Sequence, residues 1–307
     1  VYRRLCAMGV WHLVCRLCPR ECGADRESTV GFCGMKSTVR VARAALHQWE
    51  EPCLSGTDCN IGGSGTVFFS GCVMRCVFCQ NHEISAGGKG RDISVERLAE
   101  IFLELQQKGA YNIDLVNPTH YVPQILRALD IAGGRLCIPV VYNSGGYERV
   151  ETLRAMDGHA DIYLPDIKYY SDELARQLSS AENYFDTAMR AAEEMLRQVG
   201  RPVFGSGGLL KKGVIIRHLV LPGHYRDSVE VIRRVGERFG KDVLFSLMSQ
   251  YTPFYKAKDI HGLDRRITTF EYRKALDAVY AAGLEGYMQE RSSAKEEYTP
   301  DFDMTGI

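Results

Sequence analysis

From residue 66 onward, short apolar runs alternate with longer amphipathic segments. A typical amphipathic segment is 94–110, in which apolar residues recur at helical spacing behind Ser94, a candidate N-cap. The apolar runs predict strands at 66–71, 112–118, 137–146, 160–168, 213–223 and 242–251. Short apolar strands separated by amphipathic helices are typical of βαβ units in a parallel sheet. The pattern therefore predicts an α/β fold with six strand–helix repeats.

Two parallel architectures fit these repeats, a doubly wound sheet and an incomplete barrel. A doubly wound sheet binds dinucleotides through a G-x-G-x-x-G turn after a strand, and no such turn follows any predicted strand here. The glycines at 62–65 precede a strand, which favours a flexible lead-in over a phosphate site. In both architectures we expect functional residues at the carboxyl ends of the strands. Segment 202–213 is either a loop over that end or a plain surface connection.

Charge and hydropathy exclude several classes of protein. The 38 Lys and Arg residues balance 38 Asp and Glu residues, so no overall charge attracts nucleic acid or an anionic membrane. No apolar run approaches the roughly 18 residues of a membrane span, and residues 1–18 hold no signal-peptide core. We therefore expect a cytoplasmic protein that binds neither nucleic acid nor membrane.

The 11 cysteines are the abnormal feature of the composition. An odd number cannot all form internal disulfides, and in a reducing compartment clustered cysteines more often bind metal. A C-x3-C-x2-C group is formed by Cys72, Cys76 and Cys79. A second group, C-x2-C-x3-C-x10-C, is formed by Cys15, Cys18, Cys22 and Cys33. The remaining cysteines have no assigned role: Cys6, Cys53, Cys59 and Cys137.

The C-x3-C-x2-C group follows the predicted strand 66–71, so its thiols project from a loop at the carboxyl end of that strand. Three thiolates can hold three irons of a [4Fe–4S] cluster and leave the fourth iron open to a substrate or cofactor. The alternative is a zinc site that a residue such as His82 completes, since structural zinc normally has four ligands.

With Phe78 just before the third cysteine, this segment resembles the radical S-adenosylmethionine (SAM) superfamily. The wider pattern, which includes "CRLCPRECG", "GSGTVFFSGCVMRCVFCQN", "RHLVLPGH" and "DFDMTG", resembles a subgroup named after pyruvate formate-lyase activating enzyme, a glycyl-radical-enzyme activase. The resemblance implies a partial (β/α)6 TIM-like barrel over 63–307. It also implies a Cys-rich, metal-binding N-terminal extension over 1–62.

In the resembled family, SAM chelates the open iron, and its reductive cleavage releases methionine and a 5′-deoxyadenosyl radical. The resemblance and the positions at strand ends indicate the following cofactor-binding residues: Phe78, Asn117, Thr119, Asn143, Ser144, Asp166, Lys168 and Arg217. Asn117 or Thr119 stands where the family often has a Gly-Gly-Glu that binds the SAM amino group. Asp166 with Lys168 resembles an Asp-Val-Lys motif in which the Asp helps to hold a monovalent cation beside the SAM carboxylate.

Several other residues have more than one possible role. Tyr251 and His120 are candidate catalytic residues, although His120 equally fits a packing or helix-capping role. Asp227 is expected to cap the helix that follows the fifth predicted strand. The segment 47–52, "HQWEEP", either lines the substrate side or forms a polar turn. The N-terminal four cysteines ligate either a second [4Fe–4S] cluster that relays electrons or a zinc that stabilises the segment.

The leading hypothesis is a radical SAM enzyme that abstracts hydrogen from a substrate such as a protein glycine. Its partner would be an electron donor such as flavodoxin or ferredoxin. One alternative acts by the same chemistry on a peptide side chain or a small molecule. Another is an iron–sulfur electron carrier, or a zinc-dependent interaction protein, with no turnover.

Overall fold

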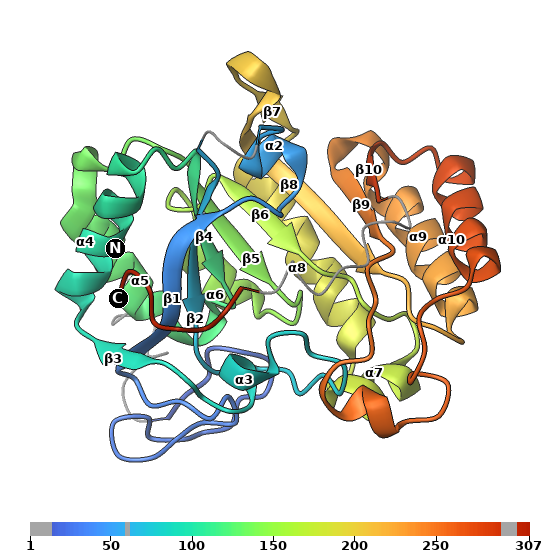
Figure 1. Ribbon diagram of the computed structural model, residues 1–307, viewed down its shortest axis with the longest axis horizontal. Helices are drawn as coiled ribbons and strands as arrows, with labels where there is room; N and C mark the ends of the chain where they lie inside the picture. The colour runs from blue at the N-terminus through green and yellow to red at the C-terminus, as the bar shows by residue number, and fades with distance from the viewer. Residues whose placement is uncertain (1–13, 59–61, 290–299) are drawn as a thin grey trace.

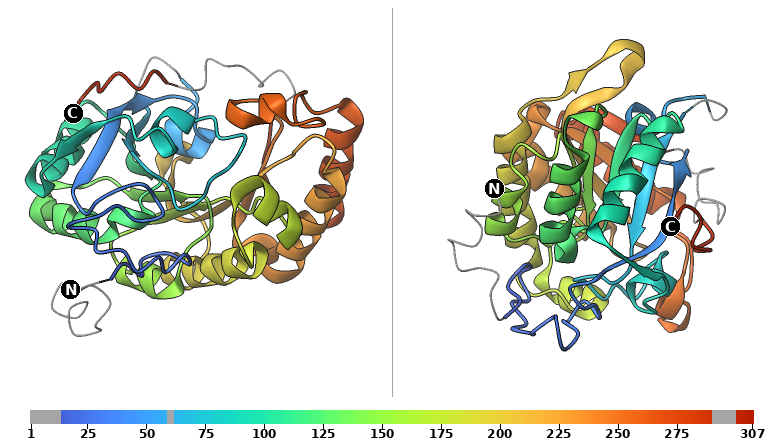
Figure 2. Two further views of the ribbon diagram at one scale, coloured as in Figure 1. Left: turned by 90° about the horizontal axis from the view of Figure 1, so that it is seen from below. Right: turned by 90° about the vertical axis from the view of Figure 1, so that its left-hand side faces the viewer.

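The computed structural model describes residues 14–58, 62–289 and 300–307. In this part of the chain ten strands form one curved sheet, and helices cover its outer face (Figures 1 and 2). The six expected strands are β2 (Ser64–Phe69), β4 (Asn112–Val116), β5 (Val140–Ser144), β6 (Ile162–Pro165), β8 (Leu210–Leu219) and β9 (Leu244–Met248). They run parallel and lie side by side in this order. The predicted α/β fold is confirmed as an open, partial TIM-like barrel.

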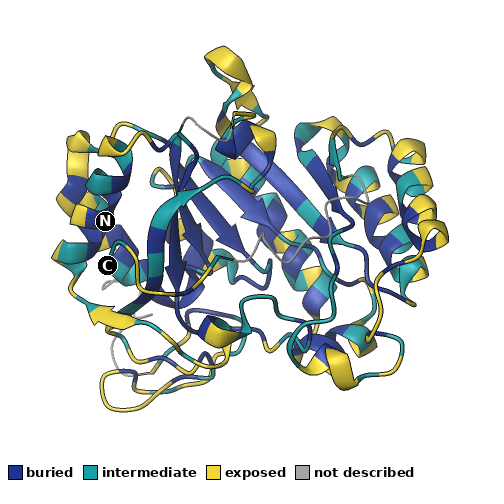
Figure 3. Cartoon of the chain, viewed as in Figure 1, coloured by how far each residue is buried: buried dark blue, intermediate teal, exposed yellow. Residues whose placement is uncertain are grey.

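A helix packs after each of these strands, as the hydrophobic pattern predicts. The long helices are α4 (Val95–Gln107), α5 (Val122–Ala132), α6 (Val150–Ala155), α8 (Tyr184–Val199), α9 (Tyr225–Phe239) and α10 (Thr269–Ala281). Shorter ones are α2 (Pro52–Ser55), α3 (His82–Ser85) and α7 (Asp172–Ser179). The six strands are largely buried on both faces, apart from Lys211 and Lys212 near the start of β8, whereas the helices expose one side (Figure 3). No helix in the described ranges is long and apolar enough to cross a membrane.

Three strands at the two edges of the sheet were not predicted. β1 (Val39–His47) pairs antiparallel with β2, and β3 (Arg91–Ile93) pairs antiparallel with β1. At the opposite edge, β10 (Gly286–Met288) lies parallel to β9. β1 belongs to the first part of the predicted division at residue 62, yet it is hydrogen-bonded to β2 in the second part. That division into two parts stays a prediction.

Of the two predicted N-caps, Ser94 is confirmed and Asp227 is not. The Ser94 hydroxyl accepts a hydrogen bond from the backbone N–H of Arg97 at 3.1 Å and caps α4 as predicted. The prediction for Asp227 is wrong, because α9 begins two residues earlier, at Tyr225. The Asp227 carboxylate instead accepts the backbone N–H groups of Tyr170 and Ser171, at 3.0 and 2.8 Å. It therefore holds the loop that follows β6.

Helix α2 closes the interior of the barrel from the amino ends of the strands. Cys53 and Leu54 of α2 are buried among inward-facing residues of β5, β6 and β8. The Leu54 carbonyl accepts a hydrogen bond from the Asn112 side chain at 2.8 Å. β7 (Val203–Phe204), within the segment 202–213, projects near α2 at the end of the molecule away from α3 (Figure 1). The segment is thus a surface hairpin with β8 and not a loop over the carboxyl ends.

Candidate functional site

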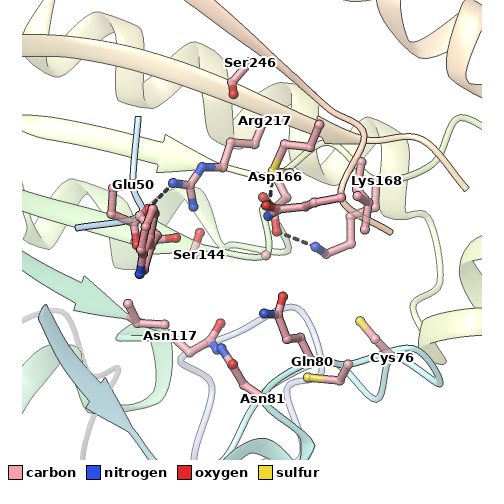
Figure 4. Close-up of a pocket in the computed structure, with 18 of the residues that line it drawn as sticks. Glu50, Cys76, Gln80, Asn81, Asn117, Ser144, Asp166, Lys168, Arg217 and Ser246 are labelled. Atoms are coloured by element: carbon pink, nitrogen blue, oxygen red, sulfur yellow. Dashed lines mark hydrogen bonds and ion pairs between the residues drawn. The ribbon is translucent and has the colours of Figure 1, made fainter. Parts of the chain in front are cut away.

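A cavity of about 310 Å³ opens at the carboxyl ends of the barrel strands. Each of the six repeats contributes a lining residue on its strand or just after it: Phe68, Val116, Asn143, Asp166, Arg217 and Ser246. Polar side chains from several elements point into this space (Figure 4). Most of the residues predicted from the sequence meet here: Cys72, Cys76, Cys79, Phe78, Asn117, Asn143, Ser144, Asp166, Lys168, Arg217 and Tyr251.

The C-x3-C-x2-C loop leaves β2 and lies at one side of the cavity. Hydroxyl groups and a backbone N–H contact its sulfur atoms. The Ser179 hydroxyl donates to Cys76 Sγ at 3.0 Å, the Ser85 hydroxyl lies 3.2 Å from Cys79 Sγ, and the N–H of Met74 donates to Cys72 Sγ at 3.4 Å. Such hydrogen bonds support negative charge on sulfur and adjust the potential of an iron–sulfur cluster.

Burial raises the pKa of all three thiols, that of Cys79 to about 11, while Lys168 nearby acts in the opposite direction. Buried sulfurs become thiolates readily only when positive charge lies close, which a bound metal supplies. Three converging thiols on one loop fit a cluster with one open iron. His82, the candidate fourth zinc ligand, instead stacks its ring on Tyr255 with 5.1 Å between centroids.

Phe78 and Tyr251 form an aromatic wall of the cavity beside the cysteines. Their ring centroids lie 6.0 Å apart, and Tyr169 packs edge-on against Phe78 with 6.5 Å between centroids. The Tyr251 hydroxyl donates to the Leu263 carbonyl at 2.7 Å. Tyr251 therefore contributes its ring to the cavity, while its hydroxyl fixes the loop that follows β9.

Asn117, Asn143 and Ser144 lie together where β4 and β5 end. The N–H of Asn117 donates to the Asn143 carbonyl at 2.9 Å, and Asn117 has a positive φ of 57°. Asn tolerates this left-handed conformation better than most side chains do. The Ser144 hydroxyl accepts the N–H of Gly146 at 3.3 Å. This corner offers amide and hydroxyl groups to the cavity.

Asp166 and Lys168 form an ion pair where β6 ends. Burial alone would lower the pKa of Lys168, but Asp166 and Cys76 outweigh burial and raise it, so the ammonium group stays charged. The N–H of Lys168 donates to the Tyr184 hydroxyl at 3.0 Å, and this hydroxyl lies 2.9 Å from the Asp166 carbonyl. Tyr184 of α8, whose role no sequence pattern indicates, thus fixes the loop that carries the pair.

Arg217 binds two carboxylates that reach the cavity from the segment after β1. Its guanidinium donates from Nε to Glu51 at 2.8 Å and also donates to Glu50. Of the two readings for 47–52, the structure favours the first, because His47, Trp49, Glu50 and Glu51 all line the cavity. The contact between Glu51 and Arg217 spans 166 residues of sequence, so sequence spacing gave no signal for it.

Thr119 and His120 lie outside the cavity lining. The Thr119 hydroxyl donates to Glu148 at 2.7 Å, and His120 Nε2 lies 2.8 Å from the Ser70 carbonyl. Burial lowers the pKa of His120 to about 3, so its ring stays neutral. These contacts give His120 a packing position beneath the cysteine loop.

The N-terminal four cysteines lie against the back of the cysteine loop. Two of these thiols lie close to Gly31: a Cβ atom added to this glycine would lie 3.4 Å from Cys33 Sγ and 3.5 Å from Cys22 Sγ. The Cys22 thiol is also hydrogen-bonded to the Cys15 thiol. No three His, Cys, Asp or Glu side chains in the described ranges surround one point at the spacing of a single metal ion. None of the described cysteines forms a disulfide.

The four unassigned cysteines divide between the interior, the surface and the segments that the structure leaves undescribed. Cys53 is buried inside the barrel and Cys137 is exposed. Cys6 and Cys59 lie outside the described residues. The two described thiols do not line the cavity.

Comparison with known proteins places this site in a family. Residues 66–236 match the model of the radical SAM superfamily. The chain is 32% identical over 272 residues to an uncharacterised protein of Methanocaldococcus jannaschii, covering 86% of this chain and 73% of that protein. It is 25% identical over 236 residues to the pyruvate formate-lyase-activating enzyme of Clostridium pasteurianum, covering 69% of this chain and 87% of the enzyme.

Solved structures of similar fold include SuiB of Streptococcus suis bound to S-adenosylmethionine, with a TM-score of 0.47 and 15% identity. The match covers 74% of this chain and 50% of SuiB. HydG, a maturase of the [FeFe]-hydrogenase, matches with a TM-score of 0.47 and 13% identity, over 71% of this chain and 48% of HydG. This chain thus spans about half the length of either protein. From its sequence matches, the chain belongs to the radical SAM superfamily, whose enzymes use a [4Fe–4S] cluster and SAM for radical chemistry.

Proposed function

We propose that this protein cleaves SAM reductively at a cluster on Cys72, Cys76 and Cys79 and abstracts a hydrogen atom from a glycine of a partner protein. The observation that carries the proposal is the convergence of these three partly buried thiols on a cavity that all six strand ends line. When bound, the cluster supplies the single electron that breaks the bond between the SAM sulfur and its 5′ carbon, giving methionine and a radical that takes hydrogen from the substrate.

The chain's own residues have distinct parts in this proposal. Phe78 and Tyr251 offer ring faces on which an adenine can stack, next to the cysteine loop. Asn117 and Ser144 offer hydrogen-bonding groups to the amino acid part of SAM. The Asp166 carboxylate and the Lys168 ammonium lie on the cavity wall, where Lys168 can bind a carboxylate and Asp166 a monovalent cation.

The choice of a protein glycine rests on the relative from Clostridium pasteurianum, whose name is pyruvate formate-lyase-activating enzyme. A barrel that is open between its edge strands can admit a loop of a partner protein. A peptide side chain or a small molecule is the alternative substrate within the same chemistry. The electron donor would be a low-potential flavodoxin or ferredoxin of the cytoplasm.

We also propose that Cys15, Cys18, Cys22 and Cys33 hold a second metal centre, either a [4Fe–4S] cluster or zinc. Cys18 and Cys33 are buried, and the Cys33 carbonyl accepts a hydrogen bond from the N–H of Cys72 at 3.3 Å. A cluster at this position would lie directly behind the cysteine loop, on a route for electrons into it. Zinc would instead stabilise a segment that has few apolar residues of its own.

The test is anaerobic incubation of the reconstituted, dithionite-reduced protein with SAM, followed by quantification of 5′-deoxyadenosine and methionine. We expect cleavage by the native protein, a loss of at least about a hundredfold in Cys76→Ala, and native activity in the control Cys137→Ala. Iron and zinc contents of Cys18→Ala identify the second metal. Full SAM cleavage by Cys76→Ala would exclude the proposed cluster site.

The substrate is tested by adding glycine-deuterated peptides that carry candidate glycyl loops. Transfer of deuterium into 5′-deoxyadenosine is the expected result. SAM cleavage without deuterium transfer from any glycine would exclude glycine as the target. A protein that carries a complete cluster but cleaves no SAM would be an electron carrier.

A further inference from the structure

The side of the cavity away from the cysteine loop has its own chemistry. Figure 4 shows Glu50 across the cavity from Cys76 and Lys168, with the Arg217 guanidinium beside Glu50. The segment 47–52 brings Glu50 and Glu51 to this side. We call this side, defined by Trp49, Glu50, Glu51 and Arg217, the acidic end of the cavity.

The acidic end has more negative than positive charge. Arg217 is the shared partner of both glutamates, and the side chains of Glu50 and Glu51 are only 9% and 6% exposed. Burial would raise the pKa of Glu51, but Arg217 outweighs it and lowers the pKa, so Glu51 stays ionised. Lys168 does not balance the charge, because it is paired with Asp166. Burial lowers the pKa of His47, which keeps that ring neutral at pH 7.

A third carboxyl group lies just beneath the acidic end. Asp114 is fully buried on the face of β4 that carries Val116, a lining residue of the cavity. Its Oδ2 accepts a hydrogen bond from Asn143 at 3.3 Å, whereas Oδ1 has no hydrogen-bond partner among the described residues. Burial and the charge of Glu50 raise its pKa well above the usual range. The negative charge of Glu50 therefore strongly opposes ionisation of Asp114.

Carboxylates removed from water are costly unless cations and hydrogen-bond donors surround them. One guanidinium faces two carboxylates here, so the charge balance of this end of the cavity leaves a place for a second cation. Aromatic side chains also line the cavity, namely Trp49, Phe68 and Tyr287. Rings of this kind attract cations through their faces and pack against alkyl chains.

We infer that the substrate carries a cationic group, a protonated amine or a guanidinium, which binds Glu50 and Glu51 at the acidic end. This inference rests on the proposed function, because the reacting hydrogen would then lie between the acidic end and the SAM beside the cysteine loop. The cation can belong to a Lys or Arg side chain of a peptide or to a free alkylamine. Both sources present the same chemistry to the two carboxylates.

The test measures binding to the anaerobic holoprotein with SAM by equilibrium dialysis. The peptide probes are acetyl-Gly-Lys-Gly-amide and its Nε-acetyllysine form, and the small probes are 1,5-diaminopentane and 1,5-pentanediol. We expect at least one cationic probe to bind roughly tenfold more tightly than its neutral counterpart, as a charged hydrogen bond predicts. The pair that shows the difference identifies the peptide or the free amine as the source.

In Glu50→Gln we expect the preference for the cation to fall to about twofold or less, while the control Glu173→Gln, an exposed position of α7, keeps it. Comparison of the probes on the native protein needs no variant, so the inference stays testable if Glu50→Gln does not fold. Equal binding of charged and neutral probes by the native protein would overturn it. Because binding is measured apart from SAM cleavage, this failure is distinct from failure of the proposed reaction.

Discussion

Single residues in this protein often have roles that their neighbours in sequence do not reveal. Thr119 was predicted to contact the cofactor, yet its hydroxyl donates to Glu148 at 2.7 Å. Tyr142 donates to the other carboxyl oxygen of Glu148 at 3.0 Å. Burial raises the pKa of Glu148 to about 7, even though these hydrogen bonds act to lower it. Glu148 thus connects β5 to the turn that follows β4, as a buried carboxyl group that keeps its proton in mildly acidic solution.

This pKa predicts how stability changes with pH. Between about pH 4.5 and pH 7 the unfolded chain has lost the Glu148 proton and the folded protein retains it, so stability falls as pH rises through this window. The Glu148→Gln variant does not titrate at this position. Relative to this variant, the free energy of unfolding of the native protein should fall by on the order of 3 kcal/mol between the two ends of the pH window. Urea unfolding of both proteins at the two ends of the window measures the difference. If the difference in free energy of unfolding between the two proteins were the same at both pH values, the raised pKa would be contradicted.

Three of the described helices, α4, α7 and α10, begin where a side chain accepts a backbone N–H of the first turn. Helix α10 begins with a capping box, in which Thr268 accepts the N–H of Glu271 at 3.2 Å and Glu271 accepts the N–H of Thr268 at 2.7 Å. The same carboxylate accepts the N–H of Gly223 at 2.6 Å and binds Arg265. The start of α10 therefore fixes the loop between β8 and α9, beside the strand that carries Arg217.

Removal of the cap should weaken the element without changing the cavity. We expect Thr268→Ala to lower the free energy of unfolding by about 1 kcal/mol, the usual effect of a lost N-cap hydroxyl. The control Arg273→Ala, an exposed position of α10, should change it by about 0.5 kcal/mol or less. Denaturant midpoints of the three proteins test this. Equal midpoints for Thr268→Ala and the control would show that the cap adds no stability.

At the scale of the whole molecule, the N-terminal segment supports the cysteine loop from behind. The Arg20 guanidinium donates to the Val73 carbonyl at 2.9 Å and to the Ser179 carbonyl at 3.3 Å. It also lies over the ring of Phe32, 4.1 Å from its centroid. Val73 lies between Cys72 and Cys76, so Arg20 connects the two cysteine groups mechanically.

Loss of this connection should loosen the proposed cluster. We expect Arg20→Met to lose iron to a chelator roughly tenfold faster than the native protein, because it loses the charge-assisted hydrogen bonds to Val73 in the loop and to Ser179, whose hydroxyl contacts Cys76 Sγ. Arg16→Met, a change at an exposed position of the same segment, serves as the control. The decay of the cluster absorbance gives both rates. Identical rates for the two variants would separate the N-terminal segment from cluster retention.

The sequence by itself determined the features that depend on local spacing. Six apolar strands between amphipathic helices were sufficient for the α/β class, and most of the polar residues predicted at the ends of those strands line the cavity. The cysteine spacing indicated a metal loop because its three thiols lie within eight residues, from Cys72 to Cys79. Strands β3 and β10 were missed because they are only three residues long and carry no clear period.

Only the tertiary structure decided which distant residues meet. It brought Glu50 and Glu51 onto Arg217, placed Asp114 beneath them, and moved His120 out of the cavity into a packing position. No periodicity encodes such contacts, since they arise when the sheet curves and α2 fills its interior. Local sequence therefore determined where chemistry can occur, while the curvature of the sheet around α2 decided the charge and shape of the cavity.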